Sequence, residues 1–140
     1  MQLSPRPRTL QIVITRRILL SSLVLLAQDD KARADAEKWL GLVDNGKYRD
    51  SWKEASKPFR TQVTAEEWER QVKGVRESIG ALESRKHAGT QATKTLPGAP
   101  DGDYIVMTFN AKFANKASAI ETVVVSKEGG SWRVAGYFVR

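Results

Sequence analysis

The feature that most constrains the fold of this chain is its last third, from Asp103 to Arg140, where apolar and polar residues alternate. Alternate positions from Ile105 to Phe113 are apolar or small, which predicts a strand with one buried face. Apolar residues from Ile120 to Val125 and the aromatic-rich ending from Ser131 to Arg140 predict two further strands. Glu128-Gly129-Gly130-Ser131 predicts the turn that joins these two strands. On the last strand we expect one shared face for Trp132, Val134, Gly136 and Phe138.

Three stretches with helical spacing precede these strands. Apolar residues recur every three or four positions from about Asp30 to Val43, from Tyr48 to Phe59 and from Trp68 to Ile79. Thr64-Ala65-Glu66-Glu67 fits a capping box and therefore predicts where the third helix starts. Pro58 lacks the amide hydrogen that a helix interior needs, so we expect the second helix to end or kink there.

The segment between the helices and the clear strands is polar. Leu82 to Leu96 alternates only weakly, which predicts an exposed or edge strand, and Pro97 to Gly102 predicts a turn. A run of helices followed by a run of strands is typical of segregated α+β packing. We therefore predict an α+β fold in which three N-terminal helices pack on a curved antiparallel sheet of about four strands.

The first 27 residues are similar to a secretory signal. Four arginines (Arg6, Arg8, Arg16 and Arg17) precede the apolar run Ile18–Leu26, and Ala27 suits the position before a cleavage site. This run is far shorter than the ~20 residues that a membrane-spanning helix needs. We expect residues 1–27 to be a signal peptide or an N-terminal anchor, with no stable membrane span after processing, and residues 28–140 to be one exported, periplasmic domain. A buried N-terminal helix is the remaining alternative.

The overall charge gives little support for nucleic-acid binding. The formal charge is +7, but removing the four leader arginines from the 23 basic residues leaves 19 against 16 acids, a net charge of +3. No basic stripe is evident in that remainder, so we expect no nucleic-acid partner. The chain has no cysteine, which excludes disulfides, thiol nucleophiles and cysteine-ligated metals.

Few residues are candidates for catalysis or metal binding. His87 is the only histidine and lies in the polar segment, so we expect a solvated side chain rather than a general base. Asp101-Gly102-Asp103 lacks the third acid and the distal glutamate of a calcium loop. Glu66, Glu67 and Glu69 fit a helix N-terminus, where negative charge is favourable. We predict no catalytic residue, no metal site and no cofactor.

Two sets of side chains are candidates for binding. The first set is the four tryptophans and their aromatic neighbours. We expect them to fill the core, because truncating a buried tryptophan costs ~3–5 kcal/mol of stability. The alternative is that they also line an apolar pocket between helices and sheet. The candidate pocket residues are Trp52, Trp68, Phe109, Trp132 and Phe138. Four arginines could meet to bind an anion or an acidic partner, but we expect them to be scattered over a solvated surface: Arg76, Arg85, Arg133 and Arg140.

Several segments together resemble a known bacterial family. They are Trp39-Leu40, Asp44-Asn45-Gly46, Tyr48–Trp52, Arg76 with Gly80, Ser84-Arg85, Leu96–Tyr104, Lys116, Glu121–Val123 and Trp132–Phe138. Over residues 32 to 140 the chain resembles the bacterial domain-of-unknown-function family 4019. This resemblance implies a small exported protein and leaves its activity open. The order of elements is also similar to cystatin-like and nuclear-transport-factor-like folds, in which a curved sheet wraps a long helix.

These observations lead to one functional expectation with two alternatives. We expect non-catalytic binding of a small apolar or amphipathic ligand, of unknown identity, in a pocket between helices and sheet. The first alternative is a module that contacts another envelope protein without a ligand. A filled core with an exposed apolar patch would favour that module. The second alternative is a small hydrolase or isomerase of the cone-fold type, which would require His87 or two facing carboxylates inside a cavity.

Overall fold

The computed structural model describes the backbone of residues 8–140 and the side chains of residues 23–140. Helices precede strands along the whole chain, and the strands form one antiparallel sheet in sequential order, β1-β2-β3-β4. The elements are α1 (Arg8–Asp44), α2 (Tyr48–Lys53), α3 (Lys57–Gln62), α4 (Ala65–Ile79), β1 (Leu82–Thr93), β2 (Tyr104–Phe113), β3 (Lys116–Glu128) and β4 (Ser131–Val139).

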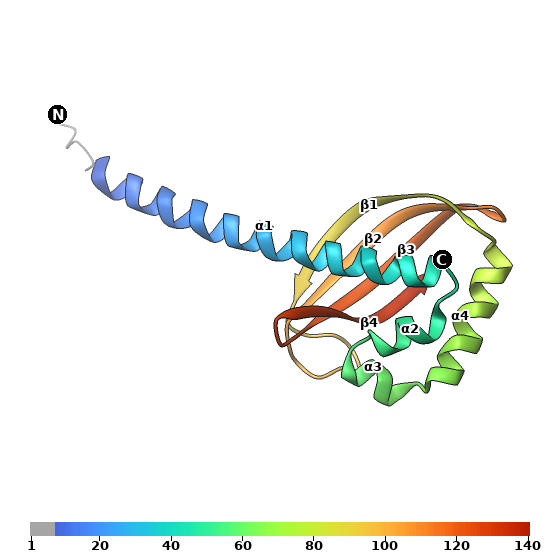
Figure 1. Ribbon diagram of the computed structural model, residues 1–140. Helices are drawn as coiled ribbons and strands as arrows, with labels where there is room; N and C mark the ends of the chain where they lie inside the picture. The colour runs from blue at the N-terminus through green and yellow to red at the C-terminus, as the bar shows by residue number, and fades with distance from the viewer. Residues whose placement is uncertain (1–7) are drawn as a thin grey trace.

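The sheet curves around the C-terminal part of α1, the short helix α3 lies beside β4, and α2 packs against α4 (Figure 1). All described helices precede the strands in sequence, and the strands form one antiparallel sheet. The predicted α+β class is therefore confirmed. The predicted edge strand is confirmed as β1, which pairs only with β2.

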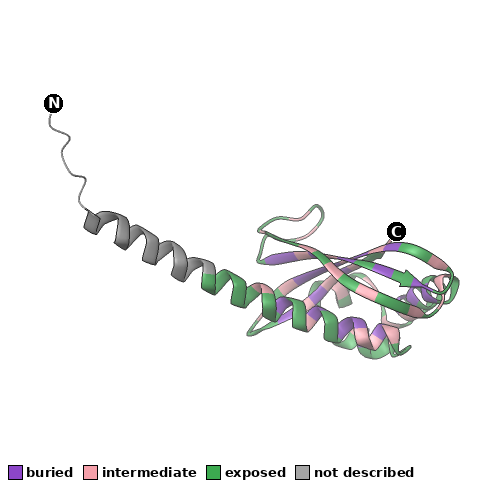
Figure 2. Cartoon of the chain, turned by 90° about the horizontal axis from the view of Figure 1, so that it is seen from above, coloured by how far each residue is buried: buried purple, intermediate pink, exposed green. Residues whose placement is uncertain are grey.

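The core lies between α1 and the covered face of the sheet. Along the described part of α1, buried positions alternate with exposed ones only where the helix reaches the sheet (Figure 2). The five apolar residues predicted to form its stripe are all buried: Ala32, Ala36, Trp39, Leu40 and Val43. From the sheet they meet alternate residues of β2, β3 and β4, including Met107, Phe109, Val123 and Val134.

The number of helices was predicted incorrectly, because the second predicted helix is two helices. The chain leaves α2 at Glu54 and begins α3 at Lys57, so Pro58 stands in the first turn of a new helix rather than at the end of an old one. Proline is well tolerated there because a first-turn amide has no partner within the helix. Ser56 caps α3 by accepting a hydrogen bond from the amide of Phe59, and its own amide donates to the carbonyl of Val134 at 2.8 Å.

The predicted start and end of α4 are confirmed. Thr64 and Glu67 form both hydrogen bonds of the capping box, and Gly80 ends the helix with φ of +82°. One detail of its predicted apolar stripe is wrong. Val75 is exposed, whereas the neighbouring Arg76 is buried, because the end of α4 faces a polar cluster rather than the apolar core.

The predicted face of the last strand is wrong beyond Val134. Val125 pairs with Val134 but Val124 pairs with Gly136, so Ala135 is an extra residue in β4. A bulge of one residue exchanges the two faces of every residue that follows. Tyr137 consequently points into the core, and Phe138 points to the other face of the sheet, where it is 62% exposed.

The N-terminal part of α1 leaves the domain. Apolar residues from Leu23 to Leu26 are exposed, which contradicts the alternative of a buried N-terminal helix for these positions. The basic residues of the predicted leader lie outside the residues whose side chains are described. Among the described residues, no helix has an apolar stretch long enough to cross a membrane.

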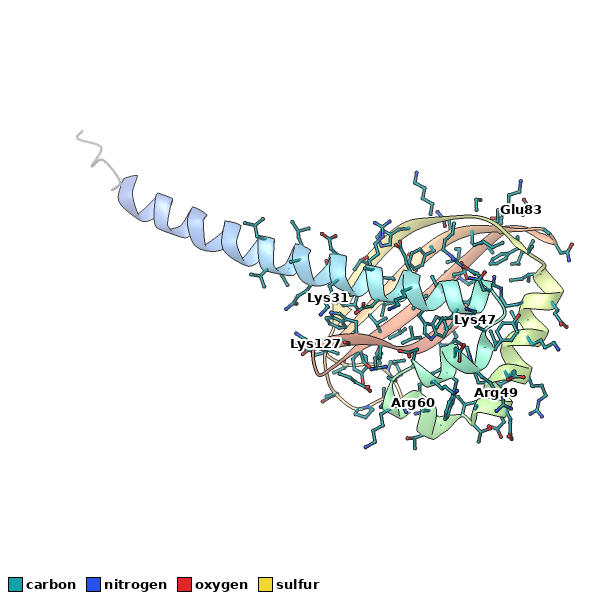
Figure 3. The ribbon with its side chains drawn as sticks, viewed as in Figure 1. Lys31, Lys47, Arg49, Arg60, Glu83 and Lys127 are labelled. Carbon is teal, nitrogen blue, oxygen red and sulfur yellow. The ribbon has the colours of Figure 1, made fainter. Side chains whose placement is uncertain are left out.

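The domain holds α1 from Lys31 onward. The Lys31 ammonium donates to the carbonyl of Gly130, in the turn between β3 and β4, at 2.5 Å. Lys31 and Lys127 lie at the same end of the domain, where α1 departs (Figure 3). The Asp35 carboxylate accepts a hydrogen bond from the amide of Trp132 at 3.1 Å. These contacts begin only a few residues after Ala27, the predicted cleavage position.

Candidate functional site

A hollow of about 430 Å³, which we call the helix–sheet cleft, opens between α1, α2 and the start of β4. Its size falls within the range of small-molecule sites, ~300–1,000 Å³. Four apolar side chains contribute to its walls, Trp39, Leu42, Trp132 and Val134, and six charged side chains surround them, Asp35, Lys38, Asp50, Lys53, Glu54 and Arg133. The cleft therefore combines apolar and charged walls.

Half of the charged side chains in the helix–sheet cleft have partners. The Arg133 guanidinium lies 3.6 Å from the Glu54 carboxylate, and Asp35 is bonded to the amide of Trp132. Among the described residues, Lys38, Asp50 and Lys53 make no side-chain hydrogen bond or ion pair. All three are exposed, so their charges are available to a molecule that enters the cleft.

The tryptophans of the helices are fixed by hydrogen bonds. Ser51, which is fully buried, accepts from two of them: its carbonyl from the Trp39 indole at 2.8 Å and its hydroxyl from the Trp68 indole at 2.9 Å. The Trp52 indole donates to the carbonyl of Val63 at 2.7 Å. A buried indole N–H needs such an acceptor, and these bonds hold α1, α2 and α4 together.

The structure distributes the five candidate pocket residues over three environments. Trp68 and Phe109 are buried in the core, and Trp52 is half-buried against it. Trp132 lines the helix–sheet cleft. Phe138 lies on the opposite face of the sheet because of the bulge at Ala135. The five residues therefore do not come together around one hollow.

Phe138 lines a second hollow of about 350 Å³, which we call the apolar groove. The groove lies between α3, the loop before β2 and the uncovered face of β3 and β4. Rings and aliphatic side chains form most of its walls, with Gln62 and Ser126 as polar members and no charged residue: Pro58, Phe59, Leu96, Pro97, Pro100, Tyr104, Val124 and Phe138. The groove offers apolar surface without an ionic partner.

Five polar residues form a buried charge cluster at the other end of the covered sheet face: Asp44, Arg76, Arg85, Glu121 and Tyr137. The Arg85 guanidinium bonds both carboxylates, with distances of 2.7 Å and 2.9 Å to Asp44 and 2.6 Å and 3.1 Å to Glu121. Arg76 donates to Asp44 at 2.8 Å, and the Tyr137 hydroxyl donates to Glu121 at 2.5 Å. The two arginines and two carboxylates balance in charge.

Burial is deep in this cluster and shifts its protonation equilibria. Glu121 is 0% exposed, and the Arg76 guanidinium also stacks over the Phe113 ring at 5.0 Å. Burial alone would raise the pKa of Asp44, but hydrogen bonds and charges from Arg85 and Arg76 outweigh it and hold this pKa below its usual value. Burial, together with the charge and hydrogen bond of Glu121, raises the pKa of the Tyr137 hydroxyl. The cluster thus favours ionised Asp44 and neutral Tyr137.

The expectation of scattered arginines is wrong for two of the four. Arg76 and Arg85 meet, but around Asp44 of their own chain, whereas Arg133 pairs with Glu54 and Glu128 elsewhere. The sequence analysis missed Glu121, which alternates with the buried Ala119 and Val123 on β3. An acid at an inward strand position is a signal for a buried cationic partner.

The remaining candidates for catalysis or metal binding are dispersed. His87 has intermediate exposure, lies 2.7 Å from the Thr90 hydroxyl, and meets the Phe109 ring edge-on at 5.5 Å. Asp103 forms an ion pair with Lys94, which lowers the pKa of its carboxyl group. In the part of the chain that the structure describes, no three His, Asp or Glu side chains cluster as metal ligands would.

Comparison with known proteins identifies a family without a described activity. A search of curated proteins gave no significant match to the sequence. The profile of one family, described as protein of unknown function (DUF4019), matches residues 35–137. That range covers the helix–sheet cleft, the buried charge cluster and all of the apolar groove except Phe138, and it begins after the predicted leader. The chain therefore belongs to the DUF4019 family.

Proposed function

We propose that the protein is an exported, non-catalytic binding protein that holds a small amphipathic ligand in the helix–sheet cleft. The observation that carries this proposal is the composition of the cleft: Trp132 and Val134 supply apolar wall, and charges without partners stand around it. A ligand with an apolar body and a polar end would match both kinds of surface.

Binding is favoured over catalysis because the candidate acids are already engaged. Asp44 and Glu121 are the two carboxylates of the buried charge cluster, and Arg85 bonds both of them. A general acid or base has to exchange a proton with a substrate within hydrogen-bond reach. His87, the other residue that a cone-fold enzyme would require, is bonded to Thr90 on its own strand.

Native mass spectrometry of the protein from its host's envelope fraction tests both parts of the proposal. We expect a chain that begins near Gln28 and carries the excess mass of one small molecule. A substitution that fills the cleft, Ser131→Trp, should remove the excess mass, and Ser118→Trp at an exposed position of β3 serves as its control. Bare protein in every preparation would contradict ligand binding, and a full-length chain in the cytosol would contradict export.

The apolar groove supports a second candidate function, contact with another envelope protein. Phe138 is 62% exposed beside a hollow that has no charged wall residue. An exposed apolar patch of this kind is typical of interaction sites. Phe138→Ser should leave stability within ~0.5 kcal/mol and abolish crosslinking to any partner in the envelope. Crosslinking that survives this substitution would contradict the second candidate.

A further inference from the structure

We infer that, before the predicted leader is removed, the protein inserts Leu23–Leu26 into a lipid bilayer and holds one defined end of the domain against the bilayer surface. That end consists of the β3–β4 turn and the loop between β1 and β2. The inference goes beyond the proposed function and does not depend on a ligand in the helix–sheet cleft. It concerns the full-length chain, whereas the proposed function concerns a chain that begins near Gln28.

The first argument is that the apolar residues at the end of the leader are exposed on every side of α1. The four residues Leu23–Leu26 are each between 58% and 62% exposed. Four consecutive residues cover a full turn of an α-helix, so this segment has no polar side. A protein partner on one side would leave apolar surface exposed on the others, whereas a bilayer surrounds a helix completely.

The apolar run of the leader is long enough to enter a bilayer but too short to cross it. As a helix, Ile18–Leu26 extends ~13 Å, whereas the hydrocarbon core of a bilayer is ~30 Å thick. Arg16 and Arg17 precede the run, and a charged residue is costly inside the hydrocarbon core. We therefore expect the run to enter one leaflet obliquely, so that these arginines stay near the lipid head groups.

The second argument is that α1 joins the apolar segment to the domain without a flexible connection. The helix is continuous from Arg8 to Asp44. The domain fixes it at Lys31, whose ammonium group donates to the carbonyl of Gly130 in the β3–β4 turn. Lys31 lies only ~8 Å along the helix from Leu26. The domain therefore follows the apolar segment as a rigid body and cannot turn freely at the bilayer surface.

Two connections of the sheet flank α1 where it leaves the domain. The β3–β4 turn is held to Lys31, and the loop between β1 and β2 (residues 94–103) lines a hollow of about 320 Å³ together with Leu25. Lys31 and Lys127 lie at this end of the domain, and Glu83 lies at the other end (Figure 3). Because the sheet curves around α1 (Figure 1), these connections are the parts of the domain nearest the bilayer, whatever the tilt of the helix.

Fluorescence quenching in the full-length chain tests this inference. The chain has no cysteine, so Gly130→Cys and Thr95→Cys each place one label on a connection near α1, and Glu83→Cys places one at the opposite end. All three positions are exposed. Glu83 lies ~33 Å from the far end of β1, which is beyond the range of a contact quencher at the bilayer surface.

The probe is a vesicle of phosphatidylcholine that carries a nitroxide quencher on part of its head groups. A neutral lipid is chosen because the end of the domain near α1 carries acids as well as lysines: Asp29, Asp103, Lys31, Lys94 and Lys127. We expect the labels of the Gly130→Cys and Thr95→Cys variants to lose most of their fluorescence. The label of the Glu83→Cys variant should lose none.

Two further variants of the full-length chain separate insertion from orientation. Leu23→Asp with Leu26→Asp puts charges on the exposed apolar segment and should abolish binding to the vesicles. Insertion of Gly-Gly-Ser-Gly after Ala27 interrupts the helix, because glycine disfavours helical backbone. That chain should still bind, but its three labels should be quenched to the same degree.

Several results would overturn the inference. They are a full-length chain that does not bind, binding that survives Leu23→Asp with Leu26→Asp, equal quenching of the three labels in the uninterrupted chain, and a difference that persists after the insertion. None of them bears on the ligand of the helix–sheet cleft. The proposed function fails instead if the native protein carries no excess mass.

Discussion

Two pairs of basic residues in this molecule have opposite surroundings. Arg76 and Arg85 are buried and bonded to Asp44 and Glu121 of the same chain. Lys38 and Lys53 stand around an open cleft, and among the described residues they have no ionic partner. The two arginines balance their two acids in charge and form ion pairs with them, whereas the lysines lie in a cleft whose acids form no described ion pair with them. The comparison indicates that the arginines serve the fold and the lysines are free to serve binding.

The choice of side chain agrees with this division. Arginine presents a planar fork that bonds two carboxylates at once, as Arg85 does, and it remains charged when buried. Lysine is more strongly hydrated, so it suits a position where water and ligand exchange. The buried charge cluster also fixes the end of α1 to β1 and β3, because Asp44 is the last residue of that helix. It supports the scaffold on which the cleft is built.

The largest effect is expected from breaking the buried charge cluster. Arg85→Met leaves two carboxylates without their shared partner, and removing one partner of a buried pair costs ~3–5 kcal/mol of unfolding free energy. Urea unfolding measures this cost. The exposed neighbour Lys86→Met is the control and should change stability by less than ~0.5 kcal/mol. A similar small effect for Arg85→Met would remove the distinction between the two pairs of basic residues.

A comparable effect is expected at the apolar wall of the helix–sheet cleft. Trp132→Ala removes a side chain that belongs to the core and should cost ~3–5 kcal/mol. Thermal unfolding should show a severely lowered melting temperature. A shift of only a degree or two would mean that the start of β4 contributes little to the core. This variant sharpens the comparison between the two parts of the cleft. The apolar wall of the cleft contributes to the stability of the fold, whereas its lysines should not.

The cluster should also make stability depend on pH at both extremes. The pKa of Asp44 is lowered in the folded state. Its contribution to folding stability is therefore present at pH values above its pKa in the unfolded chain, about 3.9, and is lost as pH falls through its pKa in the folded protein. The pKa of Tyr137 is raised in the folded state. Its contribution to folding stability is therefore present at pH values below its pKa in the unfolded chain, about 10, and is lost as pH rises above that value.

The Tyr137→Phe variant isolates the alkaline part. It should cost ~1–3 kcal/mol at neutral pH, since Glu121 loses a hydrogen bond donor, and its stability should decline less between pH 9 and about 11 than that of the native protein. Chemical unfolding at a series of pH values measures both effects. Parallel curves for the two proteins would show that Tyr137 ionises equally well in the folded state.

The smallest effect on stability is expected at the lysines of the cleft. Lys38→Gln and Lys53→Gln should each change the unfolding free energy by less than ~0.5 kcal/mol, since neither side chain has a described partner to lose. The same unfolding assay measures this. A cost above ~1 kcal/mol for either substitution would place that lysine with the arginines, as part of the fold.

The sequence predicted regular elements better than it predicted the sites. The stripe from Ala32 to Val43, the capping box at Thr64 and the alternation from Ile105 to Phe113 all depend on local spacing, which a sequence displays directly. The bulge at Ala135 was not predictable in this way, because a single extra residue leaves the local composition unchanged and yet places Phe138 on the other face.

The buried charge cluster shows the same limit for long-range contacts. Arg85 and Glu121 are separated by 36 positions, and Arg85 and Asp44 by 41. Their meeting depends on how β1 pairs with β2 and on where α1 ends, and neither follows from the residues around each charge. The helix–sheet cleft likewise depends on long-range packing, because residues of α1 and α2 line it together with the start of β4.

The most direct test of the central claim is an amide and indole NMR titration of the protein with decanoate. Ligand in the helix–sheet cleft should shift the signals of Lys38, Lys53 and Arg133 and the indole signals of Trp39 and Trp132. The indole signal of Trp52, which is bonded to Val63 away from the cleft, should stay unchanged. Shifts confined to Phe138 and its neighbours in the apolar groove, or no shifts at all, would contradict the account.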